Sequence, residues 1–151
     1  MMQLSQHFAL AEFERTSTGL PNAVPPGLIP SLTPLCIKVL EPIRAHFGPV
    51  RLNSGYRSPR VNAAVGGAPT SQHAKGEAAD IEIDGVSNLA LARWIRDNLA
   101  FDQLILEGYH LGAPSSGWVH VSWTEARAPR RSVLTMTMAS HGPVYTPGLP
   151  K

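Results

Sequence analysis

The chain has 151 residues, of which 43% are hydrophobic and 16% are charged, and its formal net charge is +2. These values are ordinary for a single globular domain with a hydrophobic core, and the positive charge is too small to indicate a nucleic-acid-binding surface. Most positive residues are scattered, but three arginines cluster near the C-terminal end. We interpret this cluster as a solvated loop, with binding to an anionic surface such as cell wall as the alternative. Its members are Arg127, Arg130 and Arg131.

The lone cysteine and the N-terminus bear on the compartment. Cys36 is the only cysteine, so no intrachain disulfide is possible, and we expect an inert core residue. The first residues have neither a basic region nor an apolar run, which predicts that there is no signal peptide, and no stretch is apolar enough for a membrane span. We therefore expect a chain that is cytoplasmic when made.

The N-terminal third is expected to supply helices and a surface connection. Residues 5–13 predict a short helix with its aromatic side chains on the core, and we interpret His7 as structural or exposed. Residues 19–34 are rich in proline and glycine, which predicts a surface connection that could form a cleft wall rather than a helix. Residues 35–47 have a helical apolar face and predict a buried core helix that bends or begins late at Pro42.

The middle of the chain predicts a strand, a loop and a second helix. Residues 50–55 resemble a short strand that ends in a turn and delivers Arg57 onto a loop. Residues 59–69 predict a further short helix or loop. Asn88 is expected to cap a core-packing helix over residues 89–99.

The C-terminal third predicts strands. Residues 101–107 alternate as a strand with Glu107 at its end, and a turn-rich segment then leads to the strand of residues 118–123. A hairpin between the two would bring Glu107 close to the second strand. Residues 133–138 alternate as a last edge strand, and residues 139–151 predict a loose terminus.

Residues 71–80, Ser-Gln-His-Ala-Lys-Gly-Glu-Ala-Ala-Asp, offer the most distinctive chemistry. Alternation after the glycine predicts a half-buried strand in which Asp80 faces away from the apolar side chains, with His73 in the preceding loop. If this strand pairs with residues 118–123, Asp80 and His120 share one face and His73 lies at its edge. Taken singly, each residue could be an ordinary polar position. Together, two histidines and a carboxylate with a fourth position left for water are the ligand set of a catalytic zinc site.

The pattern Ser-x-His-x-x-Gly-x-Ala-x-Asp has Ser-Gly-Tyr-Arg at residues 54–57 upstream and Trp-Val-His at residues 118–120 downstream. This combination resembles the zinc D-Ala-D-Ala carboxypeptidase-like family, peptidase family M15, in the branch common among phage and bacterial cell-wall peptidases. The similarity runs from about residue 8 to residue 122. The resemblance implies one bound Zn²⁺. The ligands that it implies are His73, Asp80 and His120.

The resemblance also implies roles for other residues. Arg57 matches an arginine that contacts the substrate and stabilises the developing oxyanion. Many relatives carry an acidic residue or a second histidine just before the last ligand, but residues 115–118 contain neither. We therefore expect Glu107 to be the general base, with His110 in reserve. Expected substrate-binding residues are Arg57, Ser71 and Trp118, and expected supports of the metal ligands are Gln72 and Ser122.

Together these patterns predict an α+β fold in one domain of residues 1–151, with a small antiparallel sheet that carries the metal site and packs against core helices. The resemblance implies a monomeric zinc metallopeptidase that cleaves peptidoglycan stem peptides, as a D,D-carboxypeptidase or an L-Ala-D-Glu endopeptidase. It would act in phage-type cell-wall lysis, after release or as part of a virion. Two alternatives stay open, because the usual acid is missing. One is a non-catalytic virion or wall-binding module with the same fold, and the other is a metal-dependent interaction domain.

Overall fold

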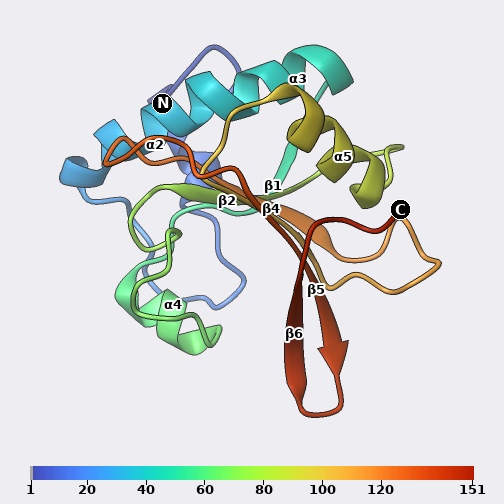
Figure 1. The fold of residues 1–151 in the computed structure, drawn as a ribbon. Coiled ribbons are helices and arrows are strands. Elements are labelled where there is room, and N and C mark those ends of the chain that lie inside the picture. Colours follow the sequence, from blue (N-terminus) through green and yellow to red (C-terminus); the bar gives the residue numbers. More distant parts are fainter. Residues whose placement is uncertain (1) are drawn as a thin grey trace.

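The chain forms a six-stranded sheet with helices packed mainly on one face (Figure 1). The structure is a computed structural model and describes residues 2–151. The strands follow the order β1-β2-β4-β3-β5-β6, and each neighbouring pair is antiparallel except β3 and β5, which run parallel. The α+β class is thus confirmed, but the sheet is mixed rather than antiparallel throughout. The strands are β1 (Arg51–Ser54), β2 (Ala78–Glu82), β3 (Gln103–Glu107), β4 (Trp118–Ser122), β5 (Ser132–Ala139) and β6 (Gly142–Pro147).

The helices that form the core lie above the sheet in Figure 1, and α4 lies on its other side. Across residues 2–151, no helix is both long and apolar enough to cross a membrane. The helices are α1 (Leu10–Phe13), the 3₁₀ turn η1 (Pro26–Leu28), α2 (Ile29–Leu35), the π-helical stretch η2 (Cys36–Leu40), α3 (Glu41–Phe47), α4 (Pro59–Ala64) and α5 (Asn88–Asn98).

The main core helix begins earlier than expected. It starts at Ile29 and continues through α2, η2 and α3 to Phe47, so the prediction of a non-helical connection over residues 19–34 is wrong for its last part. Pro30 does not prevent this, because it lies in the first turn of α2, where a backbone N–H has no intrahelical partner. Proline therefore marks the start of this helix rather than a loop.

Pro34 lies inside α2, and a third proline in this helix, Pro42, explains the π-helical stretch. The Glu41 N–H donates to the carbonyl of Cys36, five residues earlier, and the wider turn places Pro42 at the start of α3. Cys36 is fully buried here, and burial raises the pKa of its thiol to about 12, which agrees with an inert core residue. His7 is partly exposed, and its Nδ1 lies 2.6 Å from Glu41 Oε1.

The cap of α5 differs from the prediction by one residue. Ser87, not Asn88, is the N-cap, and its Oγ accepts a hydrogen bond from the N–H of Ala90 at 3.1 Å. Asn88 is instead buried, and its amide donates to the carbonyl of Gly117 at 2.8 Å. It thereby joins the start of α5 to the turn that precedes β4.

The central strands have one apolar and one polar face, as their alternation predicts. The face towards the helices is fully buried, and the opposite face carries Asp80, His120 and Glu107. Asp80 on β2 pairs directly with His120 on β4, so the expected strand pairing is confirmed. The fully buried residues on the helix side include Ala79, Ile81, Leu104, Leu106, Val119 and Val121.

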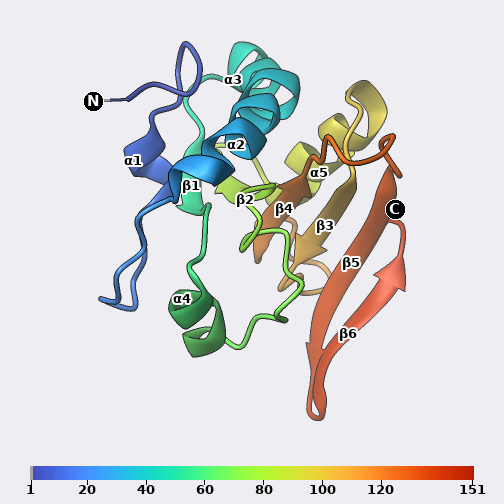
Figure 2. The same cartoon turned by 90° about the vertical axis from the view of Figure 1, so that its left-hand side faces the viewer.

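The C-terminal segment is more ordered than its sequence predicts. Residues 139–151 were expected to be loose, but β6 pairs with β5 from Leu134↔Pro147 to Ala139↔Gly142. The resulting hairpin extends beyond the rest of the sheet (Figure 2). Strand β5 is therefore not the edge strand, and the hairpin places Tyr145 close to the polar face of the sheet.

The arginine cluster is organised by a buried carboxylate, which the sequence did not reveal. Asp102 is 1% exposed and binds Arg127 and Arg130, each with a shortest distance of 2.9 Å. The Gln72 amide donates to the same carboxylate at 3.0 Å. We call residues 124–131 the basic loop. Asp102 anchors this loop to the segment that carries His73, so the loop is not simply a solvated one.

We expect Asp102→Asn to destabilise the fold in a pH-dependent way. Burial alone would raise the pKa of Asp102, but hydrogen bonds from Arg130, Arg127 and Gln72 outweigh it and lower the pKa from 3.8 to about 2. A lowered folded-state pKa stabilises the fold above about pH 4, and this contribution disappears as the pH falls towards about 2. At pH 7 the variant should lose about 2–3 kcal/mol, less than for a fully buried pair because the guanidinium groups are half exposed.

Urea unfolding of wild type and variant at about pH 7 and about pH 3 tests this expectation. The difference in the free energy of unfolding should shrink at the lower pH. A difference that is equal at both pH values would mean that the charge of Asp102 contributes nothing to folding.

Candidate metal centre

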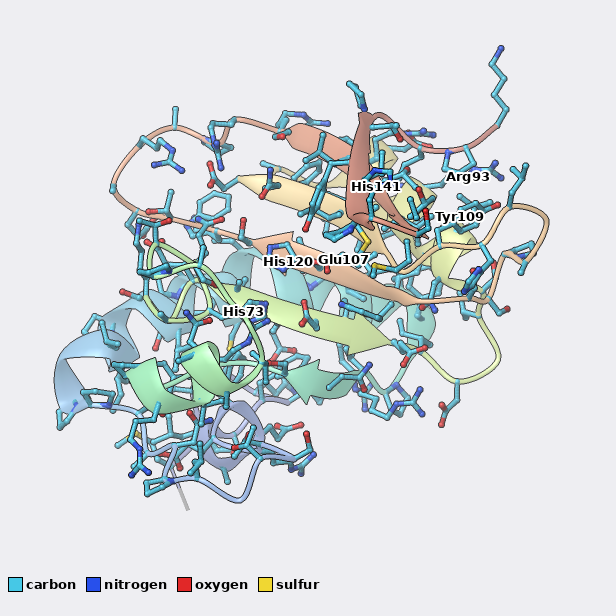
Figure 3. The ribbon with its side chains drawn as sticks, turned by 90° about the horizontal axis from the view of Figure 1, so that it is seen from below. His73, Arg93, Glu107, Tyr109, His120 and His141 are labelled. Atoms are coloured by element: carbon cyan, nitrogen blue, oxygen red, sulfur yellow. The ribbon has the colours of Figure 1, made fainter. Side chains whose placement is uncertain are left out.

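The polar face of the sheet brings together the three residues with metal-binding side chains. His73 comes from the loop before β2 and His120 from β4 (Figure 3). Asp80 lies on β2 between them, as the pairing of Asp80 with His120 requires. All three are buried, with 2%, 7% and 8% of their surface exposed. Each offers one ligand atom, and these atoms lie within 4.8 Å of one another.

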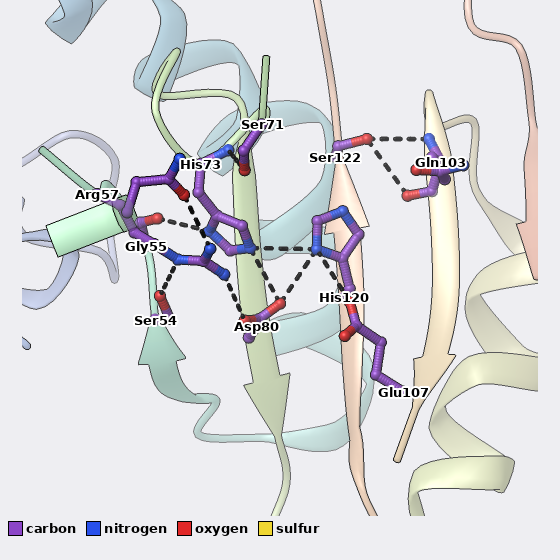
Figure 4. Close-up of polar contacts among 11 residues, drawn as sticks. Ser54, Gly55, Arg57, Ser71, His73, Asp80, Gln103, Glu107, His120 and Ser122 are labelled. Carbon is purple, nitrogen blue, oxygen red and sulfur yellow. Dashed lines mark hydrogen bonds and ion pairs between the residues drawn. The ribbon is translucent and has the colours of Figure 1, made fainter. Parts of the chain in front are cut away.

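The ligand atoms form a nearly equilateral triangle (Figure 4). His73 Nε2 lies 3.2 Å from His120 Nδ1 and 3.2 Å from Asp80 Oδ1, and His120 Nδ1 lies 3.1 Å from the same oxygen. Two ligands at about 2.0–2.1 Å from a tetrahedral zinc ion are separated by about 3.3 Å. The triangle therefore has the size of one face of a zinc coordination tetrahedron.

The hydrogen bonding of His73 also favours a cation inside this triangle. Its Nδ1 lies 2.7 Å from the carbonyl oxygen of Gly55, and because a carbonyl only accepts, Nδ1 carries the proton. In the neutral ring Nε2 is then a lone pair that faces the carboxylate of Asp80, which is repulsive without a positive charge between them. A metal ion supplies that charge, and a backbone carbonyl on the far nitrogen is the usual way to orient a histidine ligand.

The carboxylate of Asp80 is held in its anionic form. Burial alone would raise its pKa, but positive charge on the two imidazoles, when they are protonated in the metal-free site, outweighs burial and keeps the pKa of Asp80 well below its usual range. A metal ligand must be deprotonated at the working pH, and Asp80 meets this condition.

Gly55 can serve His73 because it has no side chain. A Cβ at this position would lie 2.6 Å from the ring of Phe13 and 2.8 Å from the Phe13 backbone. The N–H of Arg57 donates to the carbonyl of His73 at 3.1 Å, which ties the two loops together. The Gly55 carbonyl was missed in the sequence because a backbone oxygen leaves no signature in residue type.

Arg57 reaches the metal triangle from the loop after β1. Its Nη2 lies 3.6 Å from Asp80 Oδ2, its Nη1 donates to Asn62 Oδ1 at 3.2 Å, and its Nε donates to Ser54 Oγ at 3.4 Å. Its side chain is 17% exposed. Asn62 on α4 was not recognised from the sequence, and it holds the guanidinium in place.

Glu107 lies at the end of β3 beside the triangle. Its Oε1 is 3.7 Å from His120 Nδ1, and its side chain is 18% exposed. Burial and the charge of Asp80 raise the pKa of Glu107, while His120 and Arg57 oppose this rise. Because Glu107 pairs with Trp118, the neighbouring strand supplies the carboxylate that is absent from the segment before His120.

Two corners of the triangle, His73 and His120, line a cleft of about 540 Å³, which we call the metal cleft. Ser71 and Trp118, both expected to bind substrate, lie in its wall together with Tyr145 from β6. Ser71 Oγ also accepts from the N–H of His73 at 3.2 Å, so it shapes the loop before β2 that carries His73, which we call the ligand loop. Within residues 2–151, the indole N–H of Trp118 is a buried donor that has no partner.

The structure places three other predicted residues where their side chains do not contact the triangle. The Gln72 side chain donates to Asp102, and the Ser122 hydroxyl bonds to the backbone of Gln103. Neither side chain is hydrogen-bonded to a residue of the triangle. His110 is exposed in the turn between β3 and β4, and the residues described as lining the metal cleft do not include it. Of the two residues considered for the general base, Glu107 therefore lies beside the triangle and His110 does not.

Comparison with known proteins agrees with this geometry. A family model described as Peptidase M15 matches residues 6–122, which contain the three residues of the triangle together with Arg57 and Glu107. The chain is also similar to the zinc D-Ala-D-Ala carboxypeptidase of Streptomyces albus G, with 39% identity over 72 residues. That match covers 46% of this chain and 28% of the relative. Because the family model covers most of its length, the chain belongs to the peptidase M15 family.

Proposed function

We propose that this protein is a zinc-dependent peptidase that cleaves peptidoglycan stem peptides. The observation that carries the proposal is the triangle of His73, Asp80 and His120, two corners of which line a cleft. The family and the name of the Streptomyces relative, a zinc D-Ala-D-Ala carboxypeptidase, support a peptidase that acts on wall peptides. A set of three protein ligands with one open position is typical of catalytic rather than structural zinc.

The protein would hold Zn²⁺ through His73 Nε2, Asp80 Oδ1 and His120 Nδ1. Zinc in such a site lowers the pKa of a coordinated water to roughly 7 and polarises the scissile carbonyl. The Gly55 carbonyl orients His73 during this chemistry. The ligands are positioned before substrate arrives, which lowers the reorganisation that the reaction requires.

Glu107 is the proposed general base. Its carboxylate lies beside the triangle, where it can take a proton from the attacking water and deliver it to the leaving amine. The raised pKa suits this double role, because a shuttle works best when its pKa approaches the working pH. Arg57 would bind the carbonyl oxygen or a nearby carboxylate, and Trp118 would form part of the wall against which the substrate lies.

The finer assignments rest on the sequence resemblance. We propose that the cleaved bond is D-Ala-D-Ala or L-Ala-D-Glu, and that the protein acts as a monomer in phage-type wall lysis, after release or in a virion. A non-catalytic wall-binding module of the same fold is the competing proposal.

Arg57→Lys should reduce kcat/KM about 10²-fold and leave zinc binding unchanged. Lysine keeps the charge but lacks the planar fork that here engages Asn62, Ser54 and Asp80 together. Steady-state kinetics with zinc determination tests this expectation. Arg60→Lys, an exposed arginine on α4, is the matched control. Unchanged kinetics in Arg57→Lys would remove Arg57 from the substrate site.

The function itself is tested by amine release from purified peptidoglycan and by mass spectrometry of the products. We expect chelator-sensitive release that returns when zinc is added, and the product masses identify the bond. Zinc-dependent binding to several wall types without any release would support the non-catalytic module instead.

A further inference from the structure

A second hollow continues from the metal cleft towards the basic loop. It has a volume of about 370 Å³ and shares Ala68, Ser71, His120 and Tyr145 with the metal cleft. We call it the basic groove. It lies on the far side of His120 from Arg57, which lines the metal cleft but is not among the residues that line the basic groove. Its distinctive lining residues are Gln72, Lys75, Gln103, Arg127 and Arg130.

The charges around this groove do not cancel. Arg127 and Arg130 share one carboxylate, that of Asp102, which is 1% exposed. Arg130 uses Nε and Nη2 for this contact, at 2.9 Å each, and Arg127 uses only Nη2. The other guanidinium nitrogens stay available, and the two side chains are 47% and 49% exposed.

Lys75 adds a third positive charge from the ligand loop. It is exposed, and the ion pairs found within residues 2–151 include none with its ammonium group. The groove thus sets three cations against two carboxylates, those of Asp102 and of Glu77, which lies 3.5 Å from the same Gln72 amide, and one positive charge remains in excess. The two arginines are held at fixed positions by Asp102, and Gln72 connects that carboxylate to the residue next to His73. Such preorganised cations recognise carboxylates well.

We propose that the basic groove is a subsite for a carboxylate of the substrate peptide, adjacent to the bond that is cleaved. This inference rests on the proposed function and names a specificity-determining site for it. Arg127 and Lys75 supply the free donors, and Asp102 is a positioning residue. The two arginines lie beyond the residues matched by the family model, whereas Lys75 lies within them.

A stem peptide offers this carboxylate from two sources. One is the C-terminal carboxylate of D-Ala, which lies next to a D-Ala-D-Ala bond. The other is the free α-carboxylate of γ-linked D-Glu, which lies next to an L-Ala-D-Glu bond. Both present the same anion, so the experiment must remove them one at a time.

The test uses the zinc-loaded full chain and acetyl-L-Ala-γ-D-Glu-L-Lys-D-Ala-D-Ala. Three further peptides carry D-isoglutamine in place of D-Glu, a C-terminal amide, or both changes. The readout is kcat/KM where a peptide is cleaved and Kd by titration calorimetry where it is not. Amidation of one of the two carboxylates should weaken the readout about tenfold, the size expected for one lost ion pair in a partly exposed groove.

The variants Lys75→Gln and Arg127→Gln, singly and combined, locate the effect. We expect the double variant to lose the preference for that carboxylate and to handle the amidated peptide as wild type does. Lys38→Gln, an exposed lysine on η2, is the matched control and should keep the preference.

The proposal is wrong if wild type does not distinguish the four peptides, or if the double variant keeps the full preference. It is also wrong if the double variant weakens all four peptides equally, because that result indicates general damage. The experiment separates the subsite from the proposed peptidase function. Equal cleavage of all four peptides would support the peptidase function and contradict only the subsite. Absence of cleavage with a retained carboxylate preference in Kd would remove the peptidase and support the subsite.

Discussion

His120→Ala is expected to abolish zinc binding and to reduce peptide cleavage by about a thousandfold or more. The substitution removes one of three ligand atoms and leaves His73 Nε2 and Asp80 Oδ1 to hold the ion alone. Loss of a group that merely orients a ligand already costs about 10–100-fold, so loss of a ligand costs more. Zinc content after dialysis, measured by atomic emission, should fall from about one per chain to near zero.

His110→Ala is the matched control for this experiment. It removes a histidine from the turn between β3 and β4, where the side chain is exposed and away from the triangle. It should bind zinc and cleave peptide as wild type does. An ion that binds only the folded state stabilises it, so zinc should raise the melting temperature of the wild type. This rise should persist in His110→Ala and vanish in His120→Ala. If His120→Ala keeps its zinc, the proposed ligand set is wrong.

Glu107→Gln has the second-largest expected effect. Glutamine has the shape of glutamate but cannot accept and return a proton, so kcat should fall by about 10²–10⁴-fold. Zinc binding should persist, because Glu107 Oε1 lies 3.7 Å from His120 Nδ1 and is not one of the triangle's atoms. Steady-state kinetics and zinc content, measured on the same preparation, separate a loss of proton transfer from a loss of metal.

A control for Glu107→Gln is Glu125→Gln, which changes an exposed carboxylate that accepts from the indole of Trp123. Glutamine can still accept this hydrogen bond, so kcat should not change. If Glu107→Gln retains wild-type kcat with zinc bound, another group moves the proton, and Glu107 is only a buried carboxylate at the end of β3.

The sequence predicted the positions of Asp80 and His120 because two short-range signals coincide there. Strict alternation in β2 and β4 determines which side chains face away from the core, and this places Asp80 and His120 together once the strands pair. Alternation in β3 likewise placed Glu107 on the same face. In each case a local period and one strand pairing were sufficient.

The failures concern contacts that no local period encodes. Gln72 and Ser122 are close to ligands in sequence, but their side chains turn towards Asp102 and Gln103. Asp102 anchors the basic loop through Arg127 and Arg130, which lie 25 and 28 positions further along the chain. No local pattern in the sequence reveals contacts over that distance. Tyr145 was missed because Pro and Gly in the last residues suggested a loose end, whereas β5 provides an edge on which β6 pairs.

The helical errors have a simpler cause. Proline was read as a helix breaker over residues 19–34, but at Pro30 it occupies a first-turn position, where it is tolerated. Pro42 is accommodated by the π-helical stretch rather than by a break. Position within the helix decides the effect of proline, and composition alone does not reveal that position.

The most direct test of the metal centre is the zinc K-edge absorption spectrum of the stoichiometrically loaded protein. The account predicts about one zinc per chain, with two imidazole nitrogens and oxygen ligands at about 2.0–2.2 Å, and no sulfur. A spectrum without imidazole scattering, or a wild-type protein that binds no zinc at all, would contradict the assignment of His73, Asp80 and His120 as the ligands.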